Sequence, residues 1–234
     1  TVTLATGPAQ SAYEEFGKRY QKALAVDGID VVLLSSEGSS HNLQLLRDGQ
    51  ADVAFVQGGT AELQPDDPDN LVSLGSLFVE PLWLFYRTDA AERMHNAPRL
   101  DSLRQLRGWR VNVGSEGSGV PTLIERLLQA NKVEPGSVKL SRLEQTPATV
   151  EFLAGRLDAL VFASAPESLM VQMLLQTPGV QLLDFAQHEA YARRFPFLSP
   201  VTLPRGVADL AANVPQRDVR LVAGDRQGAS AGLH

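Results

Sequence analysis

The chain has 234 residues, of which 44% are hydrophobic and 21% are charged, and its formal net charge is −6. These values are ordinary for a soluble globular protein, and the length allows one large domain or two lobes of about a hundred residues each. The acidic balance without a Lys/Arg cluster argues against nucleic acid, no apolar run could span a bilayer, and the absence of cysteine excludes disulfides and thiolate sites.

The first part of the chain alternates strands with helices. A glycine-containing loop follows the first strand, Ser39 and Ser40 open the second helix, Gly49 follows its end, and a buried strand follows Asp52. Serine at a helix start and glycine past a helix end are the expected signals. The expected elements are, in order, strand Val2–Ala5, helix Tyr13–Ala25, strand Val31–Leu34, a helix from Ser39, and a strand from Val53.

The same order of elements returns in the second half. Leu46–Phe55 is matched, 106 residues later, by Phe152–Val161. Such alternation predicts parallel strands joined by right-handed crossovers. The matching upstream segments are strand Arg110–Val113, loop Gly114–Gly119, helix Pro121–Ala130, strand Val138–Leu140, and a helix that opens at Thr146 and Pro147.

A long segment, Val72–Arg107, separates the two halves. It contains a strand pair, Val72–Leu77 and Leu82–Arg87, and a polar stretch around Asp89–Asn96. We therefore expect an α/β protein of two Rossmann-like lobes with parallel-rich sheets, joined by a two-strand hinge; one continuous doubly wound sheet is the alternative. The expected boundaries are residues 1–87 plus 199–223 for lobe 1, 88–198 for lobe 2, and a disordered tail at 224–234, with crossings at Leu82–Thr88 and Ser199–Leu203.

Four loops or helix starts, rich in Gly, Ser and Thr, should face the space between the lobes. Ligands of open α/β sheets sit beyond the carboxyl ends of the strands, where unpaired helix N–H groups carry partial positive charge. Several such groups could hold a carboxylate without any Arg, although each loop could also do no more than cap its own helix. The four segments are Thr6–Ser11, Ser36–Ser40, Ser115–Gly119 and Gln145–Thr149.

Four groups of residues resemble the TAXI family of solute-binding proteins, which serve TRAP-type transporters. They are Leu4-Ala5-Thr6-Gly7-Pro8 with Tyr13; Gly38-Ser39 with Asn42-Leu43 and Gly49-Ala51-Asp52; Arg110–Gly114 with Gly117-Ser118-Gly119; and Gly155-Leu157-Asp158-Ala159 with Ala165-Pro166. The resemblance implies a type-2 periplasmic-binding-protein fold, a ligand such as glutamate or a related carboxylate, including dicarboxylates, and a membrane transporter as partner.

Several residue roles have two interpretations. Tyr13 could face the ligand or pack in the core, and the hydroxyls of Ser39 and Ser118 could bind ligand or cap helices. Asn42 is expected to tie neighbouring loops, and Arg142 is the cation most suspected of reaching the site. The expected ligand-binding residues are Thr6, Gly7, Tyr13, Gly38, Ser39, Gln57, Ser115, Gly117, Ser118, Gly119 and Ser164.

No metal, cofactor or catalytic motif is found. His41, His95, His188 and His234 lack ligand spacing, and the acidic run Asp66–Asp69 is interrupted by proline, as in a solvated turn. No nucleophile–base grouping or paired carboxylates can be placed in the loops, so a binding protein is favoured over an enzyme.

The expected function is therefore that of a monomeric, extracytoplasmic or periplasmic solute-binding protein that closes on a small carboxylate-bearing ligand. No leader is visible before Thr1, so the sequence is that of a cytoplasmic protein or of one whose leader was removed. The partner would be a transporter subunit or a fused membrane segment. The alternatives are a ligand-sensing ectodomain of a membrane-tethered protein and, third, a biosynthetic enzyme with the same fold.

Overall fold

The computed structural model describes residues 1–60 and 71–231, and the chain divides into two compact units. Unit 1 comprises Thr1–Val79, Glu116–Gly119 and the chain from Asp225 onward, whereas unit 2 comprises Glu80–Ser115 and Val120–Gly224. The acidic run Asp66–Asp69 and His234 lie outside the described residues.

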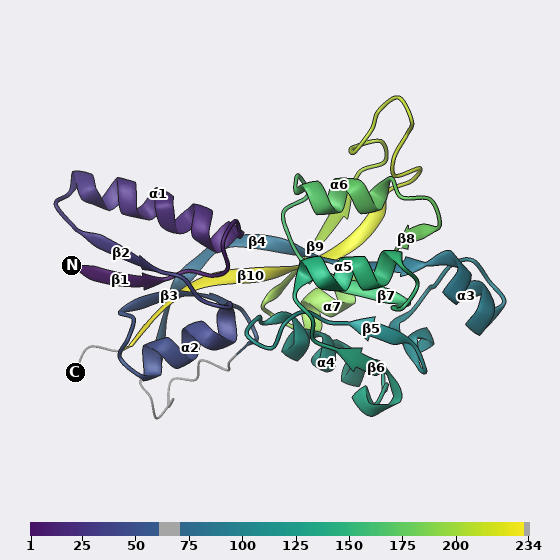
Figure 1. Cartoon of the computed structure of the whole chain (residues 1–234), viewed down its shortest axis with the longest axis horizontal. Helices are drawn as coiled ribbons and strands as arrows, with labels where there is room; N and C mark the ends of the chain where they lie inside the picture. Colours follow the sequence, from purple (N-terminus) through teal and green to yellow (C-terminus); the bar gives the residue numbers. More distant parts are fainter. Residues whose placement is uncertain (61–70, 232–234) are drawn as a thin grey trace. The chain divides into compact units, whose positions relative to one another are not determined.

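Unit 1 begins with three parallel strands and two helices. Strand β1 pairs in parallel with β2 and with β3, so the two crossovers run in opposite directions. Right-handed crossovers of opposite direction place α1 and α2 on opposite faces of the sheet (Figure 1). The elements are β1 (Val2–Ala5), α1 (Ala12–Val26), β2 (Val31–Leu34), α2 (Ser39–Arg47) and β3 (Val53–Gln57).

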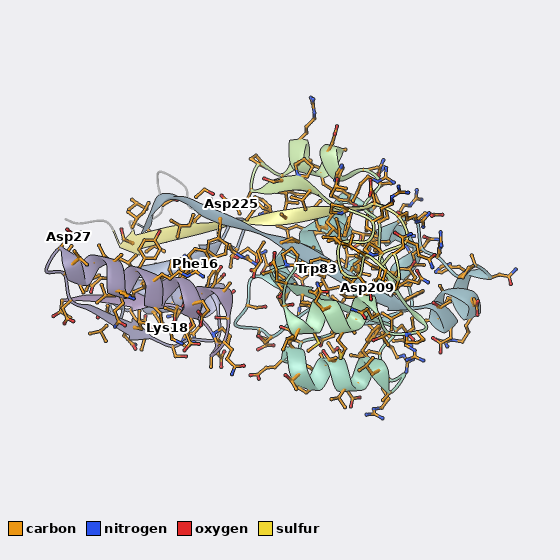
Figure 2. All side chains as sticks on the ribbon, turned by 90° about the horizontal axis from the view of Figure 1, so that it is seen from above. Phe16, Lys18, Asp27, Trp83, Asp209 and Asp225 are labelled. Atoms are coloured by element: carbon orange, nitrogen blue, oxygen red, sulfur yellow. The ribbon has the colours of Figure 1, made fainter. Side chains whose placement is uncertain are left out.

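The alternation of side chains along β1 and β3 explains the two small cores of unit 1. Leu4 and Phe55 point to the face that α1 covers, where they pack with Tyr13. Ala5 and Ala54 point to the other face and pack with Leu43 and the rest of α2. On α1 itself, Phe16 stacks on Phe78 with ring centres 4.2 Å apart, while Lys18 lies on the exposed side (Figure 2).

Two long strands, β4 (Leu71–Arg87) and β10 (Val219–Ala231), belong to both units. In unit 1, β10 pairs antiparallel with β3, and Arg226 stands opposite Gln57. The strand order in this unit is β2-β1-β3-β10-β4. β4 passes from unit 1 to unit 2 between Val79 and Glu80, and β10 passes from unit 2 back to unit 1 between Gly224 and Asp225.

Unit 2 repeats the arrangement of unit 1. Its strand order is β4-β7-β5-β6, with β5 parallel to β6 and β7, and β4 antiparallel to β7. The repeated elements are β5 (Arg110–Asn112), α4 (Val120–Ala130), β6 (Lys139–Ser141), α5 (Gln145–Leu153) and β7 (Ala159–Ala163). The others are α3 (Thr88–His95), two short 3₁₀ turns (Leu103–Leu106 and Pro135–Ser137), α6 (Leu169–Leu175), β8 (Val180–Leu182), α7 (His188–Arg194) and β9 (Leu198–Leu203).

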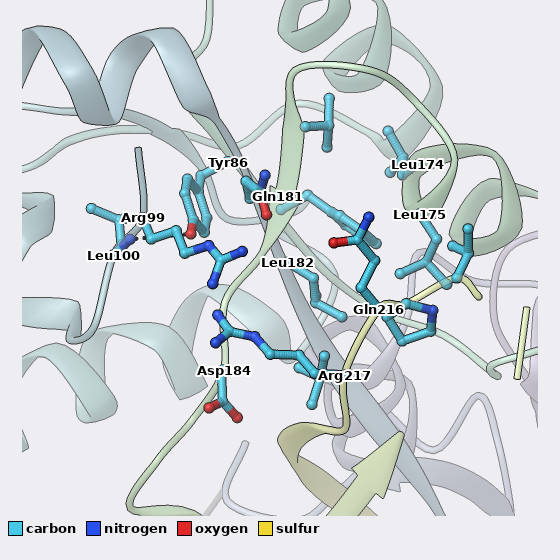
Figure 3. A pocket seen from close by; sticks show the side chains of 15 residues that line it. Tyr86, Arg99, Leu100, Leu174, Leu175, Gln181, Leu182, Asp184, Gln216 and Arg217 are labelled. Atoms are coloured by element: carbon cyan, nitrogen blue, oxygen red, sulfur yellow. Dashed lines mark hydrogen bonds between the residues drawn. The ribbon is translucent and has the colours of Figure 1, made fainter. Parts of the chain in front are cut away.

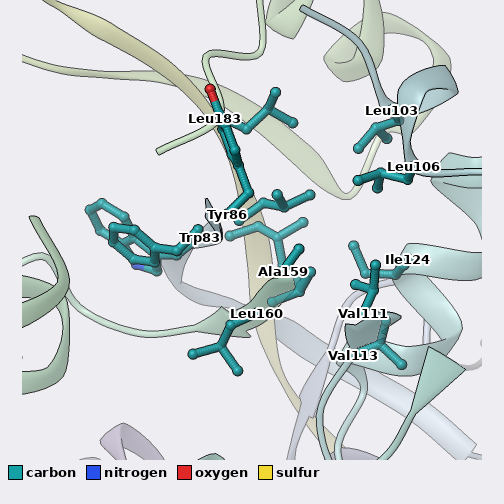
Figure 4. Close-up of a cluster of buried hydrophobic side chains, with 14 of the residues drawn as sticks. Trp83, Tyr86, Leu103, Leu106, Val111, Val113, Ile124, Ala159, Leu160 and Leu183 are labelled. Carbon is teal, nitrogen blue, oxygen red and sulfur yellow. The ribbon is translucent and has the colours of Figure 1, made fainter. Parts of the chain in front are cut away.

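One large apolar cluster holds unit 2 together. Trp83 and Trp109 are fully buried in it, and Figure 4 shows side chains from β4, β5, β7 and α4 meeting there. Both tryptophans are therefore packing residues. Burial of a large side chain contributes about 1.5–3 kcal/mol, so this cluster supplies most of the stability of unit 2.

The predicted internal repeat is confirmed. Gly49 and Gly155 follow α2 and α5 with φ of 67° and 79°, in the left-handed region that glycine adopts without strain. Asp52 and Asp158 then occupy equivalent places before β3 and β7. The fold class, a mixed α/β fold with parallel-rich sections, is as predicted.

The expectation of two separate sheets fails at β4. The predicted pair Val72–Leu77 and Leu82–Arg87 is one strand of 17 residues. Because this strand belongs to both sections, the hydrogen-bonded order runs through it as β2-β1-β3-β10-β4-β7-β5-β6. The polar stretch around Asp89–Asn96 lies almost entirely in α3.

The expected return crossing and disordered tail are also wrong. Ser199–Leu203 lies in β9, which pairs with residues 219–224 inside unit 2, and the chain returns to unit 1 only at Asp225. Residues 225–231 form the strand beside β3. Small residues such as Gly228 and Ala229 are common in disordered tails, but they also suit a tightly packed strand, and Ala229 is fully buried.

Candidate functional site

Buried polar side chains gather at one edge of unit 1, where the parallel strands β1, β2 and β3 end. Of nine buried polar or charged residues in the described part of the chain, six lie in this unit. Burying polar groups is costly unless they are hydrogen-bonded, so this concentration of buried polar side chains indicates a functional site. The six are Thr6, Ser36, Ser39, Asn42, Gln57 and Arg226.

Ser39 links three elements at this edge. Its Oγ accepts a hydrogen bond from the backbone N–H of Gln57 at 2.9 Å and lies 3.1 Å from the hydroxyl of Tyr13. The helix cap of α2 is Gly38, and no side chain caps it, so the capping interpretation of Ser39 is wrong. Tyr13 packs in the core, as one of its two interpretations held, because its ring stacks on Phe55, and its hydroxyl lies at the polar edge beside Ser39.

Asn42 ties the strand ends together, as predicted. Its Nδ2 donates to the backbone carbonyls of Thr6 and Phe55, each at 2.7 Å. Thr6 in turn donates its hydroxyl to the carbonyl of Leu34 at 3.2 Å, and the carbonyl of Gly7 accepts from the N–H of Ser36. These bonds fix the ends of β1, β2 and β3 relative to one another.

The loop Glu116–Gly119 belongs to the same edge of unit 1. The N–H of Ser40 donates to the carbonyl of Gly117 at 3.1 Å, and its hydroxyl donates to the carbonyl of Ser118 at 3.3 Å. Gly38 has φ of 127°, and a Cβ added there would come within 3.0 Å of the Gly117 carbonyl oxygen. Only glycine meets both demands, so the loops that open with Gly7, Gly38 and Gly117 do come together.

Gln57 leaves a buried hydrogen-bond donor unused. Its side chain is 2% exposed, and its Nε2 has no partner among the described residues. The hydroxyl of Thr60, which the sequence analysis did not single out, is also buried and unpartnered within this part of the chain. A Cβ on Gly119 would collide with both Thr60 Oγ1 and Gln57 Oε1, so the three residues are neighbours.

Arg226 is the functional candidate that the sequence analysis missed. It is 4% exposed, stands opposite Gln57 across the β3–β10 pair, and its guanidinium lies 5.7 Å from the centre of the Tyr13 ring. Directly opposed residues on neighbouring strands share a face of the sheet. The one available signal was a single arginine within a run of small residues that continues the apolar segment Leu221–Ala223.

Two of the predicted residues are not part of this edge, because Ser115 and Ser164 belong to unit 2. The indole N–H of Trp83 donates to the carbonyl of Ser164 at 2.9 Å. Residues 145–149 form the first turn of α5, also in unit 2, and Arg142 pairs with Glu125 at 2.7 Å there.

The chemistry of this edge suits binding an anion. Its buried side chains offer hydroxyl, amide and guanidinium donors, and none of the six is a carboxylate, imidazole, thiol or amine. A guanidinium can hold a carboxylate or sulfonate by two parallel N–H bonds. Within residues 1–60 and 71–231, no group of three or more His, Cys, Asp or Glu is placed to hold a metal.

A protein-family model matches most of the chain. Residues 4–216 match the model of the NMT1-like family. The chain belongs to this family. The matched residues include both halves of the internal repeat and end ahead of Arg226. In the described part of the chain, the helices are all too short or too polar to cross a membrane.

Solved structures share the fold at low sequence identity. The alkanesulfonate-binding protein SsuA from Xanthomonas axonopodis pv. citri, bound to MOPS, is 16% identical with a TM-score of 0.55, over 83% of this chain and 68% of that one. An ancestral arginine-binding protein bound to arginine is 15% identical with a TM-score of 0.52, over 78% and 77%. The effector-binding domain of QuiR in complex with shikimate is 14% identical with a TM-score of 0.57, over 100% and 88%.

Proposed function

We propose that this chain binds a small anionic solute at the polar edge of unit 1, with Arg226 as the group that recognises the anion. The observation that carries the proposal is the buried guanidinium of Arg226 opposite Gln57, whose amide donor has no partner among the described residues. A bidentate guanidinium–carboxylate pair and one amide hydrogen bond would satisfy a carboxylate group. MOPS, arginine and shikimate, the ligands of the similar structures, each carry a sulfonate or carboxylate group.

The proposed role is transport, as in solute-binding proteins that deliver ligand to a membrane permease. A periplasmic or other extracytoplasmic location, a TRAP-type transporter as partner, and an amino acid such as glutamate or a dicarboxylate as ligand follow from the resemblance to the TAXI family. The loops with Gly7, Gly38, Gly117, Ser118 and Gly119 would add backbone contacts.

The alternative is ligand sensing. It is favoured by the likeness to the effector-binding domain of QuiR, which covers all of this chain. Both roles need the same ligand site, so they differ in the partner and not in the chemistry of Arg226. Association with transporter subunits supports transport, whereas a ligand-dependent change in a fused or associated regulatory domain supports sensing.

A ligand screen tests the site. Amino acids, dicarboxylates and alkanesulfonates are added singly, and the midpoint of thermal unfolding is recorded. A ligand that binds only the folded protein stabilises it by RT ln(1 + [L]/Kd), about 2.7 kcal/mol at a hundredfold excess over Kd. Candidate ligands are then incubated with the protein to look for turnover, which a binding protein does not produce.

Variants at one position then identify the anion-binding group. Arg226→Gln should weaken binding of the best anionic ligand by tenfold or more, because a hydrogen bond to a charged group contributes about 1.5–3 kcal/mol. Arg226→Lys keeps the charge but loses the planar fork, so its affinity should be intermediate. Arg19→Gln removes an exposed charge from α1 and is the control. Equal affinity of Arg226→Gln and the unchanged protein would refute the proposal.

A further inference from the structure

Unit 2 contains a cavity of about 420 Å³ that shares no residue with the site in unit 1. Its walls come from the end of β4, from β8, from α6, and from the segment that precedes β10 (Figure 3). Its volume lies within the range of about 300–1,000 Å³ that small-molecule sites occupy. It is therefore large enough to take a small organic ligand.

One part of the cavity is apolar. Leu175 and Leu182 line it and are partly exposed, whereas Leu174 and Val219 are buried in its wall. Such a surface binds a hydrocarbon group by removing it from water, at about 25 cal/mol per Å² of apolar area. The cavity thus has a place for the apolar body of a ligand.

Another part of the cavity is positively charged. Arg99 and Arg217 are both exposed, and Figure 3 shows their guanidinium groups pointing toward one another. Neither makes a hydrogen bond or an ion pair with any residue in the ranges 1–60 and 71–231. Two like charges that face each other repel, and an anion between them relieves the repulsion. In a chain with net charge −6, this arrangement is not a general property of the surface.

The nearby carboxylate is hydrogen-bonded to a third arginine and offsets the charge of Arg217 only in part. Asp184 is held by Arg220, whose Nη2 and backbone N–H donate to its two oxygens at 2.5 and 2.7 Å. Burial raises the pKa of Asp184, but the bonds from Arg220 and the charge of Arg217 outweigh burial, and the pKa lies below its usual value. Asp184 is therefore ionised and paired with a third arginine.

A buried hydroxyl completes the polar wall. The Tyr86 hydroxyl oxygen accepts a hydrogen bond from the N–H of Leu100 at 3.1 Å. Burial raises the pKa of Tyr86, so the hydroxyl keeps its proton. The O–H group thus remains able to donate to a ligand on the same side as Arg99.

We propose that this cavity is a second ligand site, which binds a small organic anion with its carboxylate or sulfonate between Arg99 and Arg217 and its apolar body against Leu175 and Leu182. The site is independent of the proposed function of unit 1, because no residue is common to both. A ligand of this class has an oxyanion at one end and a short hydrocarbon chain or ring at the other.

The test uses hexanoate as probe and the full chain, with the leucine methyl groups followed by NMR. Hexanoate should shift the methyl signals of Leu175 and Leu182, and inorganic sulfate, which lacks an apolar body, should bind at least tenfold more weakly. Arg99→Gln and Arg217→Gln should each weaken hexanoate binding by tenfold or more. Both positions are exposed, so the variants are expected to fold normally.

Two controls separate this site from others. Arg104→Gln removes an exposed charge from unit 2 away from the cavity and should leave hexanoate affinity unchanged. Arg226→Gln should weaken ligands of unit 1 and leave the Leu175 and Leu182 shifts intact, so failure of one site is distinguished from failure of the other. The proposal is overturned if hexanoate up to its solubility limit leaves both methyl signals unmoved. It is equally overturned if the two arginine variants bind as the unchanged protein does.

Discussion

Arg110 holds Asp158 with its backbone and its side chain at once. The backbone N–H donates to Oδ2 at 2.9 Å, Nε donates to the same oxygen at 3.1 Å, and Nη2 donates to Oδ1 at 2.7 Å. In the equivalent place of unit 1, Asp52 accepts only the backbone N–H of Thr3 among the described residues, at 2.7 Å. The repeat thus conserves the backbone bond and adds an ion pair in one half.

This difference predicts unequal effects of removing the charge. Asp158→Asn should lower the free energy of unfolding by about 2 kcal/mol, because the buried Asp158 side chain loses charge-assisted hydrogen bonds from Arg110, whose own side chain is 41% exposed to water. Asp52→Asn should cost about 1 kcal/mol or less, since Asp52 is exposed and keeps an acceptor oxygen. Urea unfolding measures both; equal losses would show that the side chain of Arg110 contributes nothing.

The contribution of the Asp158 carboxylate to stability should be present near neutral pH and lost only in acid. Burial raises the pKa of Asp158, but hydrogen bonds from Arg110 and the charges of Arg110 and Arg93 outweigh burial, so the pKa is lowered in the folded state. A lowered folded pKa gives stability that is complete above the unfolded value of about 3.9 and is lost as the pH falls through the folded pKa. Thermal unfolding curves of the unchanged protein and Asp158→Asn should converge below about pH 4. A gap that stays constant down to pH 2 would contradict this.

Gln57→Leu should separate stability from binding. The substitution removes a buried amide donor that has no partner in the described structure, so the ligand-free protein should gain about 1 kcal/mol or stay unchanged. Affinity for the anionic ligand should fall by tenfold or more if Gln57 contacts it. The matched control is Gln21→Leu, which loses a bond of 2.6 Å to the Val31 carbonyl and should be destabilised. Destabilisation of Gln57→Leu in the absence of ligand would indicate a structural glutamine.

Gly119→Ala should disturb the polar edge through space alone. The added Cβ would overlap Thr60 Oγ1 and press on Gln57, so we expect a loss of about 1–3 kcal/mol from overpacking and weaker ligand binding. Gly136→Ala meets nothing within 4 Å and is the control, expected to be neutral or to stabilise by about 0.4–1 kcal/mol. Chemical unfolding and calorimetry measure the two effects, and equal behaviour of the two variants would argue against close packing at Gly119.

The parts of the fold that follow from local signals were predictable. Short stretches of sequence were enough to recognise the strand–helix alternation, the glycines after α2 and α5, and the repeated Asp52 and Asp158. These local signals placed Tyr13, Ser39 and Gln57 correctly at one edge. Only the capping role of Ser39 was wrong, because Gly38 takes the cap position, which frees the hydroxyl to bond across to β3.

The parts that depend on distant partners were not predictable. Residues 225–231 form a strand because β3 offers hydrogen-bonding partners from a segment nearly the whole chain away. Strand formation depends on such neighbours more than on intrinsic preference. Arg226 was not predicted as a site residue, because the strand that contains it was not predicted. The expected break between Leu77 and Leu82 was likewise absent, since Leu71–Arg87 is one continuous strand.

The place of residues 225–231 in the sheet also sets an order for biosynthesis. Residues 1–57 leave the ribosome first and can form β1, β2 and β3, but the strand that lies between β3 and β4 is made only after all of unit 2. Pairing across such a sequence separation is slow, because a long loop must close before any contact forms. Unit 2 therefore has the opportunity to fold first. The unit whose synthesis begins earliest is finished last, and its anion-binding arginine arrives with the closing strand.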